Sequence, residues 1–217
     1  MNNIFAVKFN KGNIKPSSRV WLSRQMKDPY VKRAYHEGYR SRAAFKLLEI
    51  DDKFRLIRNA KFIIDLGSAP GGWSQVLAER SVNKNAVIAS IDLQPFHSLD
   101  RIVQFCGDFE DKNLRLQIIN YFPEKVSLIA SDMAPPTSGH ASIDHIRIMM
   151  LAESTWLFAQ NMLANNGNLI IKLFQGSREK AFLESLRTSF RKVCFFKPKS
   201  SRSESSEIYV IAVGFEK

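Results

Sequence analysis

The sequence has little cysteine and no long hydrophobic run. Its 217 residues include two cysteines, Cys106 and Cys194, whose positions do not match the spacing of metal ligands. Both lie in apolar stretches, so we expect buried thiols without chemistry. No apolar run approaches the roughly 20 residues that a membrane span needs, and residues 1–15 lack the apolar core of a secretory signal. We therefore expect a soluble, cytoplasmic protein without a membrane partner.

Acidic residues are absent from the first 27 positions. Residues 1–61 carry 15 Lys and Arg against 5 Asp and Glu, whereas the remaining residues carry 17 against 16. Clustered cations suit contacts with phosphate groups, so this basic front favours a polyanionic partner. A solvated basic face that only aids solubility fits the charge equally well. An acid-free leader is also typical of an organelle transit peptide, so a mitochondrial location stays as the alternative to a bacterial cytosol.

Length and periodicity predict one α/β domain. We expect a basic, flexible arm over residues 1–20 and a single domain over residues 21–217, because the chain is long enough for one sizeable core. Apolar runs typical of strands occupy residues 62–66, 86–91, 102–105, 126–130, 168–174, 192–196 and 208–213. Patterns typical of helices occupy residues 21–35, 42–50, 73–80, 112–121, 144–163 and 179–190. This alternation predicts a doubly wound, mostly parallel sheet with helices on both faces and a ligand site beyond the carboxyl ends of its strands.

A glycine-rich turn, DLGSAPGGWS (residues 65–74), follows the first predicted strand and leads into a helix. Glycines permit a tight turn and a close approach of the backbone to a ligand, and the helix offers free N–H groups. The spacing differs from the G-x-G-x-x-G of dinucleotide-binding proteins, and Pro70 removes one amide. The turn therefore argues against a dehydrogenase.

Acidic residues end the next two predicted strands. Asp92 lies 27 residues after Asp65, where an acid commonly meets a ribose diol, and Asp108 is placed to reach an adenine amino group. Taken singly, such carboxylates more often cap loops. Three acids at successive strand ends beside a glycine-rich turn favour an adenosyl cofactor.

Five motifs occur in order: RSRAAFKL (40–47), DLGSAPGGWSQ (65–75), SDMAP (131–135), KLFQG (172–176) and SEIY (206–209). From about residue 21 to the C-terminus the chain resembles the FtsJ/RrmJ family of ribosomal RNA 2′-O-methyltransferases. The resemblance implies a Rossmann-like methyltransferase fold with a seven-stranded, mostly parallel sheet, an antiparallel last strand and S-adenosylmethionine as cofactor. It implies the catalytic residues Lys46, Asp132, Lys172 and Glu207. It implies the cofactor contacts Gly67, Gly71, Trp73, Asp92, Asp108 and Asp132.

The implied reaction is methylation of a uridine ribose 2′-hydroxyl in large-subunit ribosomal RNA, within the assembled large ribosomal subunit. We expect a monomer that needs no metal. Where the family usually continues Asp-Met-Ala-Pro with asparagine, this chain has Pro136. The change removes a hydrogen-bonding side chain near the implied target ribose, so we expect substrate positioning to differ while the cofactor chemistry is kept.

Physical reasoning alone gives these residues plainer roles. Lys172 interrupts an apolar run, where a lysine ordinarily lays its stem along the core and keeps its ammonium at the surface. Glu207 alternates with apolar residues of the last strand and requires a cationic partner, either Lys172 or Lys46. Spacing on its own helix pairs Lys46 with Glu49 at the surface. Lys172 would act either as a general base, favoured by a nearby Lys46, or as an orienting cation, favoured by a nearby Asp132.

Further basic residues are placed to follow an RNA backbone, although each is an ordinary surface charge by default. They are Arg33, Arg40, Arg42, Lys197, Lys199 and Arg202. We expect Met149 and Met150 to pack in the core with Trp156 and Phe158. An amino-methyltransferase is disfavoured, because no aromatic residue follows Pro135 and Pro136. A protein that only binds RNA would have no reason to keep two lysines and two acids in a cleft.

Overall fold

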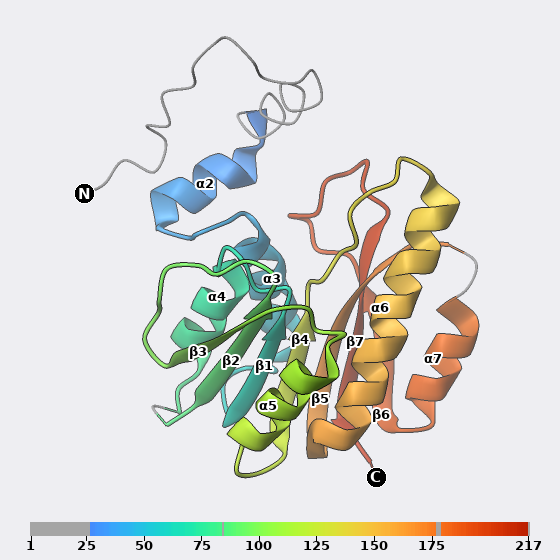
Figure 1. The fold of residues 1–217 in the computed structure, drawn as a ribbon. Coiled ribbons are helices and arrows are strands. Elements are labelled where there is room, and N and C mark those ends of the chain that lie inside the picture. The colour runs from blue at the N-terminus through green and yellow to red at the C-terminus, as the bar shows by residue number, and fades with distance from the viewer. Residues whose placement is uncertain (1–26, 84, 177–178, 217) are drawn as a thin grey trace.

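The computed structural model describes residues 27–83, 85–176 and 179–216 (Figure 1). The expected arm over residues 1–20 lies outside these ranges. So do residues 21–26 of the helical pattern expected over residues 21–35. The described residues form a seven-stranded sheet in the order β3-β2-β1-β4-β5-β7-β6. The doubly wound α/β architecture predicted from the alternation of strands and helices is confirmed.

Every predicted strand is present, with small shifts at the ends. The strands are β1 (Phe62–Leu66), β2 (Val87–Asp92), β3 (Ile102–Cys106), β4 (Val126–Ser131), β5 (Leu163–Phe174), β6 (Phe190–Phe196) and β7 (Glu207–Phe215). Neighbours from β3 to β5 run parallel, whereas β7 is antiparallel to both β5 and β6. The predicted antiparallel last strand is confirmed. β5 begins earlier than predicted because it continues directly from the end of the preceding helix.

The described helices are α2 (Pro29–Glu37), α3 (Ala43–Phe54), α4 (Gly72–Arg80), α5 (Lys112–Tyr121), α6 (Ala141–Met162) and α7 (Glu179–Arg187). Within the helical pattern predicted over residues 21–35, the described part contains a break at Asp28 before α2. Asp28 has extended backbone, and its carboxylate accepts a hydrogen bond of 3.0 Å from the amide of Tyr30. Pro29 fits the first helical position because no intrahelical hydrogen bond is required there. The helix therefore begins at Pro29, and it ends before Gly38, whose φ is 77°.

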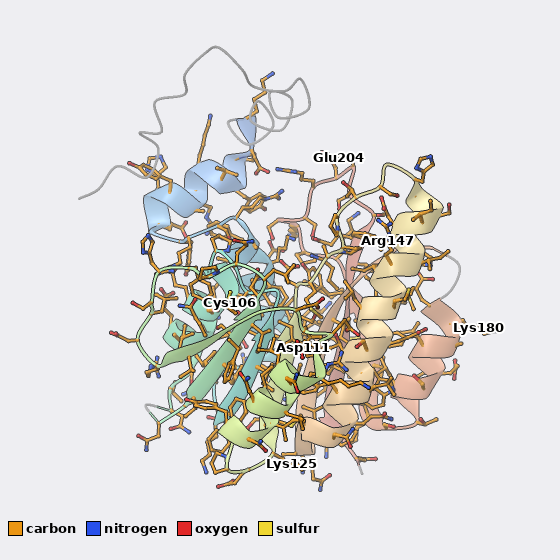
Figure 2. All side chains as sticks on the ribbon, viewed as in Figure 1. Cys106, Asp111, Lys125, Arg147, Lys180 and Glu204 are labelled. Atoms are coloured by element: carbon orange, nitrogen blue, oxygen red, sulfur yellow. The ribbon has the colours of Figure 1, made fainter. Side chains whose placement is uncertain are left out.

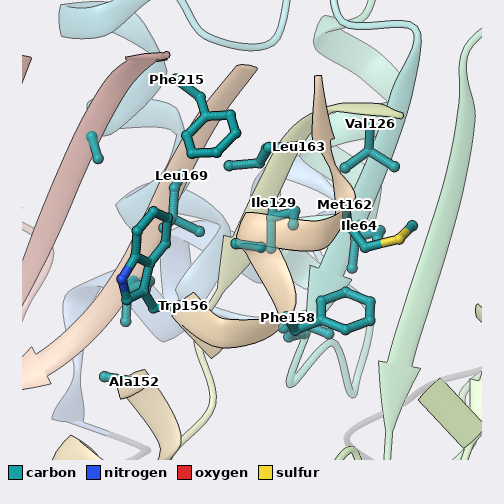
Figure 3. Packing of buried hydrophobic residues seen from close by; sticks show 14 of the residues in the cluster. Ile64, Val126, Ile129, Ala152, Trp156, Phe158, Met162, Leu163, Leu169 and Phe215 are labelled. Atoms are coloured by element: carbon teal, nitrogen blue, oxygen red, sulfur yellow. The ribbon is translucent and has the colours of Figure 1, made fainter. Parts of the chain in front are cut away.

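Two apolar layers hold the helices against opposite faces of the sheet (Figure 1). One layer joins α3 and α4 to the sheet through residues such as Leu47, Leu77 and Ile63. The other joins α5, α6 and α7 to the second face. Figure 3 shows part of that second layer, where Trp156 and Phe158 of α6 lie beside strand residues. Burial of these side chains is the main favourable contribution to folding.

Two expectations about single side chains are wrong. Met149 is buried as predicted, but Met150 is 64% exposed, because one step along a helix turns a side chain by about 100° and so away from the core. Cys106 was expected to be buried, yet it lies exposed at the end of β3, where the strand leaves the sheet (Figure 2). Cys194 is half-buried.

The strand order reverses direction between β1 and β4, which are paired up to their carboxyl ends at Leu66 and Ser131. In open α/β sheets a crevice forms at such a point, because the connections leave toward opposite faces. The glycine-rich turn after β1 and Asp132 after β4 both lie at this position. The fold therefore brings the sequence motifs to one edge of the sheet.

Candidate active site

Four distant segments bring Lys46, Asp132, Lys172 and Glu207 together. Lys46 comes from α3, Asp132 follows β4, Lys172 lies in β5, and Glu207 is the first residue of β7. The Lys46 Nζ lies 2.6 Å from Glu207 Oε2 and 3.9 Å from Asp132 Oδ1. The Lys172 Nζ lies 3.0 Å from Asp132 Oδ1 and also donates to the backbone carbonyl of Asp132. We call these four residues the quartet.

The quartet consists of two close, buried ion pairs that a third, longer ion pair connects. Lys172 pairs with Asp132, whereas Lys46 pairs with Glu207 and extends toward Asp132. The alternative that Lys46 forms a surface pair with Glu49 is wrong, because Lys46 is buried and Glu49 instead accepts from backbone amides. Removing one partner of such a pair leaves an uncompensated buried charge. The four charges therefore depend on one another for their stability in the core.

The carboxylate of Asp132 is the centre of this arrangement. Burial alone would raise its pKa, but the neighbouring Lys172 and Lys46 cations and hydrogen bonds from Tyr209 and Lys172 outweigh burial and hold the pKa below its usual range. Asp132 is therefore ionised at neutral pH. A carboxylate of this kind is a poor proton acceptor and a good anchor for cations.

Tyr209 completes the site, and the sequence reasoning missed this role. Its hydroxyl donates a 2.6 Å hydrogen bond to Asp132 Oδ1, and its ring lies 5.8 Å below the Lys46 ammonium. Burial, together with the charges of Asp132 and Glu207, raises the pKa of Tyr209 well above its usual value, so the phenol stays protonated. The signal was present in the sequence: Tyr209 follows Glu207 by two positions, which places both on one face of a strand.

A cavity of about 530 Å³ opens at the carboxyl ends of β1, β2, β3 and β4. This size is within the usual range for small-molecule sites. Its walls come from Gly67, Ile91, Asp92, Leu93, Gly107, Asp108, Phe109, Glu110, Asp132, Met133, Ala134, Pro135, Pro136, Arg147, Met150 and Leu151. Asp132 belongs both to the quartet and to the cavity wall. Figure 2 labels Arg147, which projects from α6 beside this region.

Three predicted cofactor contacts besides Asp132 lie in the cavity wall, and each has a visible reason for its position. Gly67 has a φ of 76°, and a Cβ there would come within 2.7 Å of the Met133 amide nitrogen. Asp92 accepts hydrogen bonds from the amides of Ala69 (2.9 Å) and Gln94 (3.0 Å). Asp108 accepts from the Glu110 amide at 2.9 Å. Both acids therefore stabilise loops through hydrogen bonds to backbone amides, and both also line the cavity.

Trp73 and Gly71 are placed differently. The Trp73 side chain does not line the cavity: it is buried, its indole N–H donates to the Ala43 carbonyl at 2.8 Å, and its ring lies 5.6 Å from that of Tyr209. The Trp73 side chain is therefore held within the protein, its amide lies in the first turn of α4, and its contact with a cofactor stays a prediction. Gly71, with φ 99°, precedes α4 and is covered by Phe96.

The residues that line the cavity can be compared with the chemical groups of an adenosyl cofactor. Gly67 lines the cavity and lets the Met133 backbone pack closely against it, and Asp92 and Asp108 present carboxylate oxygens that accept hydrogen bonds from hydroxyl and amino groups. Apolar side chains, including Phe109, Met133 and Leu151, supply flat contact surface for a base. This donor and acceptor set fits an adenosyl group.

Asp65 is a fully buried acid at the end of β1 that the quartet does not use. Its Oδ2 accepts a 2.6 Å hydrogen bond from the Ser74 hydroxyl, whereas its Oδ1 has no partner. Burial raises the pKa of Asp65 to about 7, against the opposing effect of the Ser74 hydrogen bond. Its ionisation therefore falls in the physiological range.

Asp65→Asn is expected to flatten the dependence of stability on pH. Because the folded pKa lies above the unfolded value, the contribution of Asp65 is fully present below pH 4 and is lost as pH rises toward 7. The full loss is on the order of 4 kcal/mol at most. We expect urea unfolding between pH 5 and 8 to show a smaller decline for the variant. Glu153→Gln, an exposed change on α6, serves as control, and an equal decline in all three proteins would contradict the assignment.

Three of the six predicted RNA-binding residues hold parts of the protein together through their side chains. Arg42 and Arg202 both form ion pairs with Asp28, at 2.9 Å and 3.1 Å. Arg40 donates to the carbonyls of His97 and Ser98 and so holds the loop after β2.

Three other predicted RNA-binding residues stay more accessible. Arg33 is exposed and paired with Glu37 at 2.6 Å. Lys197 and Lys199 are exposed in the segment after β6. The contact of Arg33, Lys197 and Lys199 with RNA stays a prediction. The contact of Arg40, Arg42 and Arg202 with RNA also stays a prediction, and these three side chains connect segments of the protein.

Two structural features of other classes of protein are absent from the described residues. Among them, no group of three or more His, Cys, Asp or Glu side chains is arranged to hold a metal ion. Within the same ranges, none of the helices combines the length and the apolar character needed to cross a membrane.

Comparison with known proteins agrees with this geometry. Residues 39–215 match the family model described as FtsJ-like methyltransferase. The chain is 47% identical over 199 residues to the "Ribosomal RNA large subunit methyltransferase E" of Granulibacter bethesdensis, covering 92% of this chain and 85% of that protein. It is 43% identical over 211 residues to the protein of the same name from Sinorhizobium medicae, covering 96% and 86%.

A solved structure shows the same fold. The crystal structure of a ribosomal RNA methyltransferase from Plasmodium falciparum superposes with a TM-score of 0.72 at 30% identity, covering 82% of this chain and 98% of that one. The family match spans the glycine-rich turn, the cavity and all four members of the quartet. The chain belongs to the FtsJ-like methyltransferase family.

Proposed function

We propose that this methyltransferase transfers a methyl group from S-adenosylmethionine to the ribose 2′-hydroxyl of a uridine in large-subunit ribosomal RNA, within the assembled large subunit. The observation that carries the proposal is the convergence of the quartet at the wall of a cavity suited to an adenosyl group. The names of the relatives support ribosomal RNA of the large subunit as the substrate.

The quartet suits this reaction because of what the hydroxyl requires. A ribose hydroxyl is a poor nucleophile, whereas the sulfonium of the cofactor, when bound, supplies a strongly electrophilic methyl group. The protein must align the hydroxyl oxygen with that methyl group, allow the hydroxyl proton to leave to solvent, and stabilise the negative charge that develops on the oxygen as the proton departs. Two fixed ammonium groups beside the cavity provide such stabilisation.

Lys172 holds the 2′-oxygen in this proposal. A lysine ammonium has three N–H donors, and the Lys172 Nζ directs two at Asp132, one to the carboxylate and one to the backbone carbonyl. One donor direction is left for the substrate oxygen. Asp132, with its lowered pKa, anchors Lys172 rather than removing the hydroxyl proton. Glu207 anchors Lys46 in the same way, and Lys46 adds positive charge beside Asp132.

Cofactor binding and methyl transfer test the proposal directly. We expect S-adenosylmethionine to raise the melting temperature, because a ligand that binds the folded state stabilises it by mass action. We expect tritiated methyl groups to enter large ribosomal subunits in an alkali-stable linkage, which marks a 2′-O-methyl ribose. Naked ribosomal RNA and transfer RNA are assayed beside the subunits. Absence of transfer to every RNA would leave only an RNA-binding role.

The remaining proposals concern the surroundings of the enzyme. We propose that the enzyme is a monomer. We also propose that it acts in the bacterial cytoplasm, which the bacterial sources of the curated relatives support. The exposed Lys197 and Lys199 and the exposed Arg33 supply cations for the RNA backbone. Pro136 lines the cavity at the position where the family usually has asparagine, so the target ribose is positioned without that amide.

A further inference from the structure

The segment between β6 and β7, residues 197–206, reaches the quartet through one buried side chain. The Ser201 hydroxyl donates a 2.7 Å hydrogen bond to Glu207 Oε1. The other oxygen of the same carboxylate, Oε2, accepts from the Lys46 Nζ at 2.6 Å. Both oxygens of Glu207 therefore have a defined donor, and Ser201 itself is only 8% exposed.

Helix α3 fixes the position of this segment. The Glu49 carboxylate accepts hydrogen bonds from the backbone amides of Lys199 (2.6 Å) and Ser200 (2.9 Å), and Arg42 donates to the Ser200 carbonyl. Lys46 lies on the same helix, between Arg42 and Glu49. One rigid element thus holds the ammonium of Lys46 and the backbone next to Ser201.

A free carboxylate would not hold this geometry. The last torsion of a glutamate side chain is broad, so a carboxylate with one partner turns easily. A second donor on the other oxygen restricts this rotation and keeps Oε2 directed at Lys46. The orientation of Glu207 therefore depends on the Ser201 hydroxyl.

We propose that Ser201 is a positioning residue for methyl transfer, which acts by orienting Glu207 so that Lys46 stays beside Asp132. This inference rests on the function proposed above, because it assigns the quartet to the reaction. It extends the working site to the segment between β6 and β7. Ser201 does not itself touch substrate or cofactor.

Steady-state kinetics of the full chain test the inference. We expect Ser201→Ala to lower kcat about tenfold, equivalent to about 1.4 kcal/mol, while the KM for RNA and the Kd for S-adenosylmethionine stay unchanged. Ser201→Thr keeps the hydroxyl and should restore most of kcat. Ser203→Ala changes an exposed serine of the same segment and should have no effect. Wild-type kcat in Ser201→Ala would overturn the proposal, and so would parallel losses of kcat, cofactor affinity and melting temperature.

A double-mutant cycle shows whether Ser201 acts through Glu207. Once Glu207→Ala has removed both oxygens that accept from Ser201 and Lys46, adding Ser201→Ala should lower kcat no further. An additional tenfold loss would contradict the proposal, because Ser201 would then act by another route.

A measurement independent of activity separates this inference from the proposed function. The Lys46 ammonium signal in NMR spectra of lysine-labelled protein, assigned by its loss in Lys46→Met, should broaden beyond detection in Ser201→Ala and persist in Ser203→Ala. An unchanged signal would overturn the proposal even if the wild-type chain methylated RNA. Absence of methyl transfer by the wild-type chain would instead defeat the proposed function, while the signal would still report on the Ser201 contact.

Discussion

Lys172→Ala is expected to lower kcat for methyl transfer by about 10³-fold while leaving the affinity for S-adenosylmethionine nearly unchanged. The reason is geometric: Lys172 directs its ammonium at Asp132 but does not line the cavity, so it serves the substrate oxygen more than the cofactor. Single-turnover methylation of large subunits and calorimetric titration of the cofactor measure the two quantities separately.

Controls for Lys172→Ala come from the same chain. Lys192→Ala removes an exposed lysine of β6 and should leave both quantities unchanged. Lys172→Arg keeps the cation, so partial activity would indicate an orienting cation, whereas activity as low as in Lys172→Ala would indicate a general base. Equal loss of kcat and of cofactor affinity in Lys172→Ala would refute the role given to Lys172.

Asp132→Asn is expected to lower both methyl transfer, by about 10³-fold, and cofactor affinity, in contrast to Lys172→Ala. Asp132 is the member of the quartet that also lines the cavity, and its Oδ1 lies within 3.9 Å of both lysine ammonium groups. An amide keeps the shape of the side chain but leaves two buried cations without their shared counterion.

Calorimetric titration, single-turnover rates and urea unfolding measure the effects of Asp132→Asn. The stability contribution of Asp132 is present above pH 4, because its folded pKa lies below its unfolded value, and it disappears as pH falls further. The difference in unfolding free energy should therefore be fully visible at pH 7. Asp100→Asn, an exposed change outside the cavity, is the matched control. Cofactor affinity at the wild-type level in Asp132→Asn would contradict a contact between Asp132 and the cofactor.

Short-range patterns predicted the sheet well because the central strands β1, β2 and β4 are mostly buried apolar runs. Residues 62–66 were predicted as a strand and form β1 with the same limits. The start of α2 was missed because apolar spacing continues past Asp28, and the capping carboxylate and Pro29 decide where that helix begins. Helix spacing also placed Met150 beside Met149 without showing which of the two faces the sheet.

Long-range pairing could not be derived from spacing. Local spacing assigned Lys46 to Glu49, whereas the strand pattern left Lys172 or Lys46 as the partner of Glu207. The partner is Lys46, 161 positions away in the chain. Only the resemblance to a known family indicated that the four residues belong together, and neither the resemblance nor the spacing identified Ser201. The residues that orient a site depend on how the connecting segments pack, which sequence patterns of this length do not encode.

The antiparallel ladder between β5 and β7 limits how this chain can change in length over evolution. Lys172 lies opposite Tyr209 and Phe174 lies opposite Glu207, so one shared register sets the distance between the two ion pairs. Inserting or deleting a single residue inside either strand would turn the following side chains to the opposite face. Length variation among descendants should therefore be confined to the connecting segments, and the two strands should be inherited as a unit of fixed size.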